Sequence, residues 1–154
     1  MAERIMTQGT LDLLLAKKRE LEGEIRMRGA ESSGHQRASI HDDAGAENAL
    51  NLLRGTLMRI GDLSYVSVIQ PPKHADVVNL GTKVRIQFED GEEELTVLSQ
   101  DDVIYRKDIG QVVSPESPLG MAILGKKKGD TAEFQLSRSG KARVRILDIS
   151  RGNF

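Results

Sequence analysis

The sequence predicts an α+β protein, in which an antiparallel helical hairpin precedes a small antiparallel sheet with one helix. Up to about residue 60, apolar residues recur at the spacing of helices that pack in pairs. From Thr82 onward, apolar and polar residues alternate as in half-buried strands. Pro71 and Pro72 stand between the two patterns and disfavour helix just before them. We therefore expect a helical domain over 1–73 and a sheet domain over 74–154.

The composition narrows the class of protein. Only 3% of the 154 residues are aromatic and none is Trp, which suits an elongated, surface-rich molecule better than one large globule. The net charge of -1 predicts no general attraction to nucleic acid. Without cysteine, disulfides and thiolate metal sites are excluded. The apolar run Leu13–Leu15 is too short for a signal peptide or a membrane span, so we expect a cytoplasmic protein.

A first helix is expected to begin with Thr7 or Thr10 as its N-cap and to carry Asp12 in its first turn. Its apolar residues keep an a/d-like spacing: Leu11, Leu14, Leu15, Leu21 and Ile25. Each glycine inside a helix costs about 1 kcal/mol relative to alanine. Because three glycines follow residue 22, we expect this helix to end or fray near Gly29.

A second helix is expected to follow, with Asp42 or Asp43 as its cap. Its apolar residues form one stripe: Ala46, Ala49, Leu50, Leu53, Leu57 and Ile60. Two helices with narrow apolar seams, joined by a polar segment, predict an antiparallel hairpin.

The second half predicts short strands and one short helix. The expected strands cover Thr82–Phe88, Glu94–Ser99, Ile109–Val113, Thr131–Leu136 and Ala142–Ile149. Glu89–Gly91 is a turn between the first two of them. The helix over Ser117–Leu124 has Ser117 as N-cap, Pro118 at its first position and Gly125 just past its end.

The segment Ser114–Asp130, SPESPLGMAILGKKKGD, resembles the C-terminal signature of the Gre family of bacterial transcription elongation factors. With the hairpin and the proline-marked joint, the resemblance covers essentially the whole chain. It implies that the second half is similar in fold to FKBP-type prolyl isomerases and docks on RNA polymerase, at the rim coiled coil of the largest subunit. The matching partner-binding positions are Glu116, Ser117, Pro118 and Leu119. Glu116 is the better candidate, because Ser117 and Pro118 also start a helix.

The same segment nearly fits a phosphate-binding P-loop over Gly120–Lys127. The last position of a P-loop is Ser or Thr, and here it is Lys127. The intervening residues are apolar and predict burial against the sheet rather than a nucleotide site. Lys126–Lys128 is expected to be a solvated run that leads into a turn at Gly129–Asp130.

The acidic segment His41–Ala49 lies where the hairpin must reverse. The family resemblance implies that this tip enters the secondary channel of the polymerase, in reach of backtracked RNA. It also implies that tip carboxylates help to hold a Mg²⁺ ion there, for which Asp42, Asp43 and Glu47 are the candidates. Carboxylate oxygens are the ligands that Mg²⁺ prefers, and paired metals can drive hydrolysis of RNA. The protein itself would bind no cofactor stably and would not be an enzyme.

The tip departs from the pattern of the cleaving family members, which resembles D-hydrophobic-x-E-N-A-E-Y. Glu47 follows Asp43 by four positions where that pattern has three, and Leu50 and Asn51 replace its final Glu-Tyr pair. Catalytic geometry tolerates displacements of only about half an ångström. An inhibitor of the polymerase, similar to some relatives with altered tips, is therefore slightly favoured over a cleavage factor.

Simpler interpretations stay open beside these. Asp42 and Asp43 can act as helix caps alone. His35 and His41 at the tip are a weak signal for a transition metal. The basic residues of the first helix would contact RNA by the family resemblance, but interleaved glutamates favour a salt-bridged, solvated face: Lys17, Lys18, Arg19, Arg26, Arg28 and Arg37.

Two other functions remain as alternatives to a polymerase-binding monomer. One is a coiled-coil interaction module unrelated to transcription. The other is a prolyl isomerase, for which the second half offers few aromatic side chains: Phe88, Tyr105, Phe134 and Phe154.

Overall fold

The computed structural model describes residues 4–34, 40–136 and 140–154, without the side chains of residues 30–34 and 40–44. The chain divides into two compact units. The first unit joins Met1–Thr10 to Val66–Phe154, and the second is Leu11–Tyr65. This division differs from the expected domains 1–73 and 74–154, because the start of the chain and residues 66–73 group with the second half of the chain.

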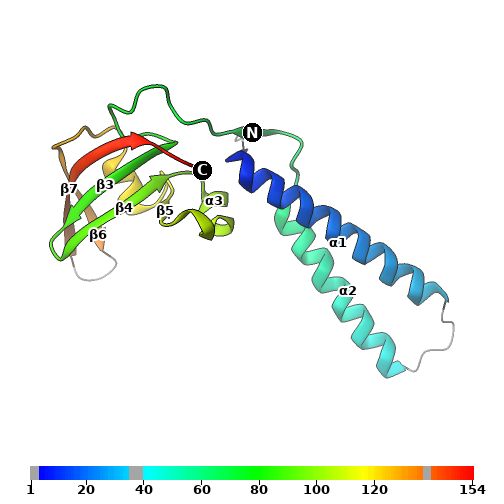
Figure 1. The fold of residues 1–154 in the computed structure, drawn as a ribbon. Helices are drawn as coiled ribbons and strands as arrows, with labels where there is room; N and C mark the ends of the chain where they lie inside the picture. The colour runs from blue at the N-terminus through cyan, green and yellow to red at the C-terminus, as the bar shows by residue number, and fades with distance from the viewer. Residues whose placement is uncertain (1–3, 35–39, 137–139) are drawn as a thin grey trace. The chain divides into compact units, whose positions relative to one another are not determined.

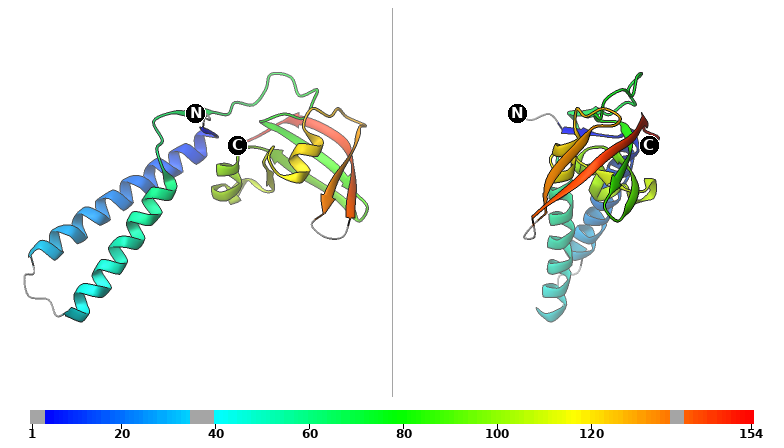
Figure 2. Two further views of the ribbon diagram at one scale, coloured as in Figure 1. Left: turned by 180° about the vertical axis from the view of Figure 1, so that it is seen from behind. Right: turned by 90° about the vertical axis from the view of Figure 1, so that its left-hand side faces the viewer.

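The second unit contains the predicted pair of helices. Helix α1 spans Gln8–Gly34 and helix α2 spans Ile40–Ile60, and they run side by side in opposite directions (Figures 1 and 2). Leu14, Leu21 and Ile60 are buried on the expected apolar seam, and Leu11 and Ile25 are half-buried. Leu15, which was expected on the same seam, is exposed. Along the rest of the α2 stripe the side chains are half-buried from Ala49 onward, whereas Ala46 is exposed.

Helix α1 continues through Gly29, where we expected it to end. A glycine costs about 1 kcal/mol in a helix, which the hydrogen bonds and the buried seam of a 27-residue helix can offset. Among the described helices, none is both long and apolar enough to cross a membrane.

The helix starts only partly follow the predictions. Thr7 is the N-cap of α1, since its hydroxyl accepts a hydrogen bond from Thr10 N at 3.3 Å. Asp12 lies beyond the first turn of α1, not in it. Helix α2 begins at Ile40, so Asp42 and Asp43 lie inside its first turn and do not precede it.

The first unit is built on a five-stranded sheet with the order β5-β4-β3-β7-β6 (Figure 1). Its strands are β3 (Thr82–Phe88), β4 (Gly91–Val97), β5 (Val112–Val113), β6 (Thr131–Leu136) and β7 (Gly140–Arg151). The expected strands are all present, with shifted ends except for β3 and β6.

The sheet is not wholly antiparallel as expected, because β5 runs parallel to β4. A parallel partner requires a crossover of about a dozen residues or more. Helix α3 (Gln100–Tyr105) and a 3₁₀ turn (Lys107–Ile109) form that crossover. Neither was predicted, and both are too short to show a helical period.

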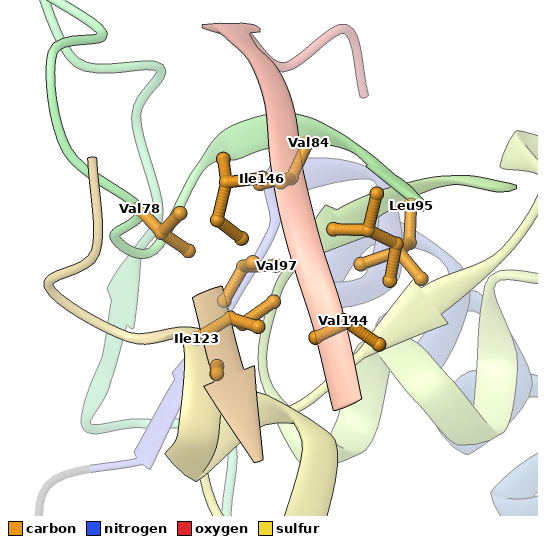
Figure 3. Packing of buried hydrophobic residues seen from close by; sticks show 9 residues of the cluster. Val78, Val84, Leu95, Val97, Ile123, Val144 and Ile146 are labelled. Carbon is orange, nitrogen blue, oxygen red and sulfur yellow. The ribbon is translucent and has the colours of Figure 1, made fainter. Parts of the chain in front are cut away.

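The core lies between the sheet and helix α4 (Pro118–Ile123). The alternation along β3 buries Val84 and Ile86, whose neighbours point to the other face. Figure 3 shows Ile123 of α4 directed into the core cluster, to which Val97 of β4 and Ile146 of β7 also belong. The core therefore fixes the face of α4 that is left for other contacts.

A second, two-stranded sheet ties the start of the chain to the first unit. Strand β1 (Arg4–Met6) pairs in parallel with β2 (Val66–Val68), and Ile69 N donates to Met6 O at 2.9 Å. Three-residue strands have too little pattern to be recognised in a sequence. This sheet places the beginning of α1 and the segment after α2 in the same unit.

The double proline also packs within this unit rather than forming a free joint. A Cβ on Gly81 would lie 2.9 Å from Gln70 O and 3.2 Å from Pro72 Cδ. Gly81 has a φ of 89°, a conformation that favours glycine. Glycine at this position allows residues 70–72 to lie against the end of the sheet.

Candidate functional site

The predicted partner-binding segment lies between β5 and α4, in a tight turn. Ser117 Oγ accepts from Gly120 N at 3.0 Å and donates to Ser114 O at 2.8 Å. Ser117 is thus the N-cap of α4, and Pro118 occupies its first turn, as predicted. The positive φ of Gly125, two residues after the end of α4, also agrees with its predicted place.

Glycine is required at the third helical position of this turn. A Cβ on Gly120 would lie 1.8 Å from Ser114 O and 2.9 Å from Ser117 Oγ. Contacts that short cannot form without displacing the backbone. Gly120 therefore lets the turn and the start of α4 pack closely together. This close packing fixes the positions of the side chains that the turn and the helix carry.

The four predicted partner-binding residues do not share one environment. Glu116 and Pro118 are exposed, whereas Leu119 packs against the core and Ser117 is occupied as a cap. Of the four, Glu116 and Pro118 are thus the ones free to meet a partner.

Two exposed apolar side chains extend this surface and were not predicted as site residues. Met121 on α4 is 63% exposed, and Leu124 at its C-cap is 42% exposed. The spacing of Pro118, Met121 and Leu124 at intervals of three residues was visible in the sequence. Only the position of Ile123 in the core shows which side of α4 faces solvent.

The remainder of the P-loop-like segment is part of the fold. Ile123 is buried and Ala122 is half-buried, as expected for a helix against the sheet. Met121 and Leu124 are exposed, so the expected burial of this apolar run is only partly confirmed. Lys127 N donates to Asp130 Oδ2 at 2.8 Å, which forms the predicted turn. Lys127 and Lys128 are exposed, as expected of a solvated run, whereas Lys126 is half-buried.

The hairpin carries the second predicted site. Glu47 is exposed on α2, whereas the side chains of Asp42, Asp43 and His41 lie outside the described part. His35 lies outside it altogether. Positions 43 and 47 are four apart in α2 and so belong to one face of that helix. Among described side chains, no three histidines or carboxylates are grouped as metal ligands. The arrangement of the acidic tip stays a prediction.

Some charged residues of α1 pair as the sequence predicted. Lys17 lies 3.8 Å from Glu20, and Arg28 lies 3.3 Å from Glu24, both exposed. Exposed pairs of this kind contribute about 0.3–0.5 kcal/mol.

A buried carboxylate that the sequence analysis missed joins the start of α1 to α3. Asp102 is fully buried and accepts hydrogen bonds from Thr7 N at 3.0 Å and from Thr7 Oγ1 at 2.7 Å. It also accepts from the hydroxyls of Thr10 and Ser99. The pattern Ser-x-x-Asp over 99–102 is a capping-box signal, and Ser99 is indeed the N-cap of α3. No local signal connects it to Thr7.

Burial by itself would raise the pKa of Asp102. The hydrogen bonds from Thr10, Ser99 and Thr7 outweigh the burial and hold the pKa of Asp102 below its usual range. Asp102 is therefore a charged group, and both of its oxygens accept hydrogen bonds from the protein.

Two arginines form further hydrogen bonds near the starts of α1 and α3. Arg4 of β1 donates from Nε and Nη2 to the Asp101 carboxylate, at 3.0 Å each. Arg106 Nη1 donates to Thr7 Oγ1 at 3.2 Å, and its Nε pairs with Asp108 at 3.0 Å. A Cβ on Gly9 would lie 2.0 Å from Arg106 Nη1. The first turn of α1 is therefore in direct contact with α3 and the turn that follows it.

Comparison with known proteins places the second half in a described family. Residues 72–151 match the family model "Transcription elongation factor, GreA/GreB, C-term". The chain is 38% identical over 86 residues to transcription elongation factor GreA of Streptomyces coelicolor, a match that covers 55% of the chain and 52% of that protein. It is 32% identical over 160 residues to GreA of Rhizobium etli, across 99% of the chain and all of that protein.

Solved structures in the same family superpose only loosely. The crystal structure of GreA factor homolog 1 of Thermus thermophilus matches with a TM-score of 0.41 at 18% identity. That match covers 97% of the chain and 99% of the other. With a TM-score this low, family membership is decided by the sequence matches.

Proposed function

The chain belongs to the GreA/GreB family of transcription elongation factors, and on this premise we propose how it acts on bacterial RNA polymerase. The first unit binds the polymerase, and the hairpin places its acidic tip in the secondary channel, which modulates elongation or initiation. The observation that carries the proposal is the match to a complete relative across 99% of the chain, which covers both units. Across the part that the structure describes, nothing favours a prolyl isomerase or an unrelated coiled-coil module.

The docking surface of this proposal is the turn before α4. Glu116 and Pro118 are exposed there, and Gly120 and Ser117 hold the turn from within. The partner is the rim coiled coil of the largest polymerase subunit, at the position that the family resemblance implies. Ser117 and Leu119 contribute by shaping the turn, because their side chains are engaged in the cap and the core.

The length of the hairpin suits an arm that reaches into a channel. At about 1.5 Å per residue, a helix like α1 spans about 40 Å and one like α2 about 30 Å. Their described outer faces are mostly polar, as expected for an arm surrounded by water before it binds. The acidic residues belong to the start of α2, at the end of the hairpin where the chain reverses.

At the tip, Asp42, Asp43 and Glu47 are the candidate ligands for Mg²⁺ in the complex with polymerase. The exposed carboxylate of Glu47 fits a hard cation, which prefers oxygen ligands. Such an ion, when bound, would activate water for hydrolysis of RNA. The protein is then an accessory factor without an active site of its own, acting in the bacterial cytoplasm as a monomer.

Inhibition is slightly favoured over cleavage. The carboxylate spacing between Asp43 and Glu47 is one residue longer than in cleaving members, and Leu50 and Asn51 replace the Glu-Tyr pair. A displacement of a few ångströms at a ligand would be enough to prevent the correct geometry. The hairpin can occupy the channel whether or not its carboxylates have the geometry that metal binding requires.

Transcript cleavage in stalled elongation complexes tests the proposal. Prompt shortening of the RNA that is lost in the double variant Asp43→Ala, Glu47→Ala would establish cleavage. Slower initiation without shortening would establish inhibition. Glu22→Ala, an exposed glutamate on α1, is the matched control and should behave as wild type. If the protein neither binds polymerase nor changes transcription, the proposal is wrong.

A further inference from the structure

Asp102 connects separate segments of the first unit through both of its oxygens. Its Oδ1 accepts from Thr7 N at 3.0 Å, from Thr7 Oγ1 at 2.7 Å and from Thr10 Oγ1. Its Oδ2 accepts from Ser99 N at 3.1 Å and from Ser99 Oγ at 2.7 Å. Thr7 N also lies 3.3 Å from Oδ2. Oδ1 therefore binds the start of α1, and Oδ2 binds the start of α3 together with Thr7 N.

The residues held by Oδ1 belong to a helix that leaves this unit. Helix α1 begins at Gln8, its first three residues belong to the first unit, and from Leu11 onward it belongs to the hairpin. Thr7 and Thr10 are fully buried, and Thr7 caps the helix. The carboxylate also lies at the N-terminus of both helices, where negative charge is favourable. Asp102 thus binds the first turn of α1, the helix that continues into the hairpin.

A carboxylate suits this arrangement, because both of its oxygens only accept hydrogen bonds. The N–H of Thr7 donates to Oδ1 at 3.0 Å and also lies 3.3 Å from Oδ2, to which the N–H of Ser99 donates at 3.1 Å. An asparagine has a single accepting oxygen, which these two N–H groups would have to share, and its NH₂ group could accept from none of the hydroxyls that donate to Asp102. Asparagine would therefore keep fewer of these hydrogen bonds than aspartate, and the link to α1 would weaken.

We propose that Asp102 is a positioning residue for the action on polymerase, because it holds the first turn of the arm's first helix in the unit that docks. This rests on the function proposed above. Docking itself uses the turn before α4, whereas the hydrogen bonds of Asp102 come from Thr7, Thr10 and Ser99. Loss of the link to α1 should therefore leave binding intact and weaken what the bound protein does through its hairpin.

The test uses Thr10→Val in the full-length protein, with Thr10→Ser as the matched control. Valine has nearly the shape of threonine but no hydroxyl, so the link to α1 weakens while the Ser99 cap of α3 remains. Serine keeps the hydroxyl. Asp102→Asn is the second variant, and Asp101→Asn, which removes the neighbouring charge that pairs with Arg4, is its control.

The first measurement is amide hydrogen exchange in the free protein, which needs no polymerase. Hydrogen bonds to a charged group are strong enough that losing one should accelerate exchange over residues 10–14 by about tenfold. Exchange in β3 and β7 should not change, and Thr10→Ser should match the wild type. Unchanged exchange over residues 10–14 in Thr10→Val would overturn the proposal, whether or not the protein acts on polymerase.

The second measurement separates affinity from effect. In Thr10→Val, the affinity for polymerase should change by less than about threefold, while the effect at saturating protein falls by about tenfold. A protein that is merely destabilised would lose affinity and effect together, and its effect would recover at a higher protein concentration. Faster exchange with an undiminished effect at saturation would also overturn the proposal. If wild type itself does not bind polymerase, the proposed function fails, and the exchange result still decides whether Asp102 holds α1.

Discussion

Asp102 accepts hydrogen bonds from both the backbone N–H and the hydroxyl of Thr7, a residue 95 positions earlier in the chain. Through this contact the first residues of the protein belong to the unit that is otherwise formed by its second half. The residues at the start of α1 are thus held within the first unit by a buried charge.

The charge of Asp102 should make stability depend on pH in the acid range. Its pKa is held below the ordinary value of 3.8, so the stabilisation is fully present above that pH and is lost as the pH falls through the lower folded value. Asp102→Asn should cost about 2 kcal/mol or more near neutral pH. The difference in urea midpoint between wild type and variant should then shrink below pH 3.8.

The control is Asp148→Asn, whose exposed side chain lies 3.9 Å from Lys128. Its urea midpoint should stay close to wild type, because exposed pairs contribute little. A wild-type advantage over Asp102→Asn that stays constant down to the lowest pH would contradict the assignment of a charged Asp102.

Glycines in the two units should respond oppositely to alanine. Gly120→Ala should destabilise the first unit by about 2 kcal/mol or more, because the new Cβ would collide with the Ser114 carbonyl oxygen. Gly55→Ala should stabilise the hairpin by up to about 1 kcal/mol, because a Cβ there would meet nothing within 4 Å outside the backbone of its own helix. Thermal unfolding of both variants checks this, and equal shifts in one direction would refute it.

Reversing one charge should test the docking surface without disturbing the fold. Glu116→Lys should weaken polymerase binding while the melting temperature stays unchanged, because Glu116 is exposed and outside the cap of α4. Ser117→Ala should instead lower stability by about 1 kcal/mol through loss of the cap. Binding is measured with immobilised polymerase.

Glu92→Lys is the matched control, since Glu92 is an exposed glutamate on β4 of the same unit. It changes the net charge equally. If it weakens binding as much as Glu116→Lys does, the effect is general electrostatics and the surface is elsewhere.

Restoring the family pattern at the tip should raise cleavage. Ala44→Asp creates the three-residue spacing to Glu47, and Leu50→Glu with Asn51→Tyr restores the missing pair. In stalled complexes, the triple variant should shorten RNA at least about tenfold faster than wild type, the factor that corresponds to about 1.4 kcal/mol in the barrier. No gain in cleavage, with binding retained, would show that these departures do not explain a weak cleavage activity.

Much of the candidate site could be predicted because its determinants are local. The cap at Ser117, the proline at the first turn of α4 and the glycine after its end are signals within nine residues. Local signals could not show which side chains of this segment are exposed and which pack against the core. Leu119 and Met121 are both apolar and only two apart, and the packing of α4 on the sheet decides which is free.

By itself the sequence determined the helical hairpin, the strands β3 and β6, and helix α4, because periodic burial and capping act within one element. The tertiary structure alone decided that β5 runs parallel to β4, that the double proline lies beside Gly81 at the end of the sheet, and that Thr7 donates to Asp102. Such contacts join segments many residues apart. Their partners are chosen by the packing free energy of the whole unit, which leaves no periodic trace in the sequence around either residue.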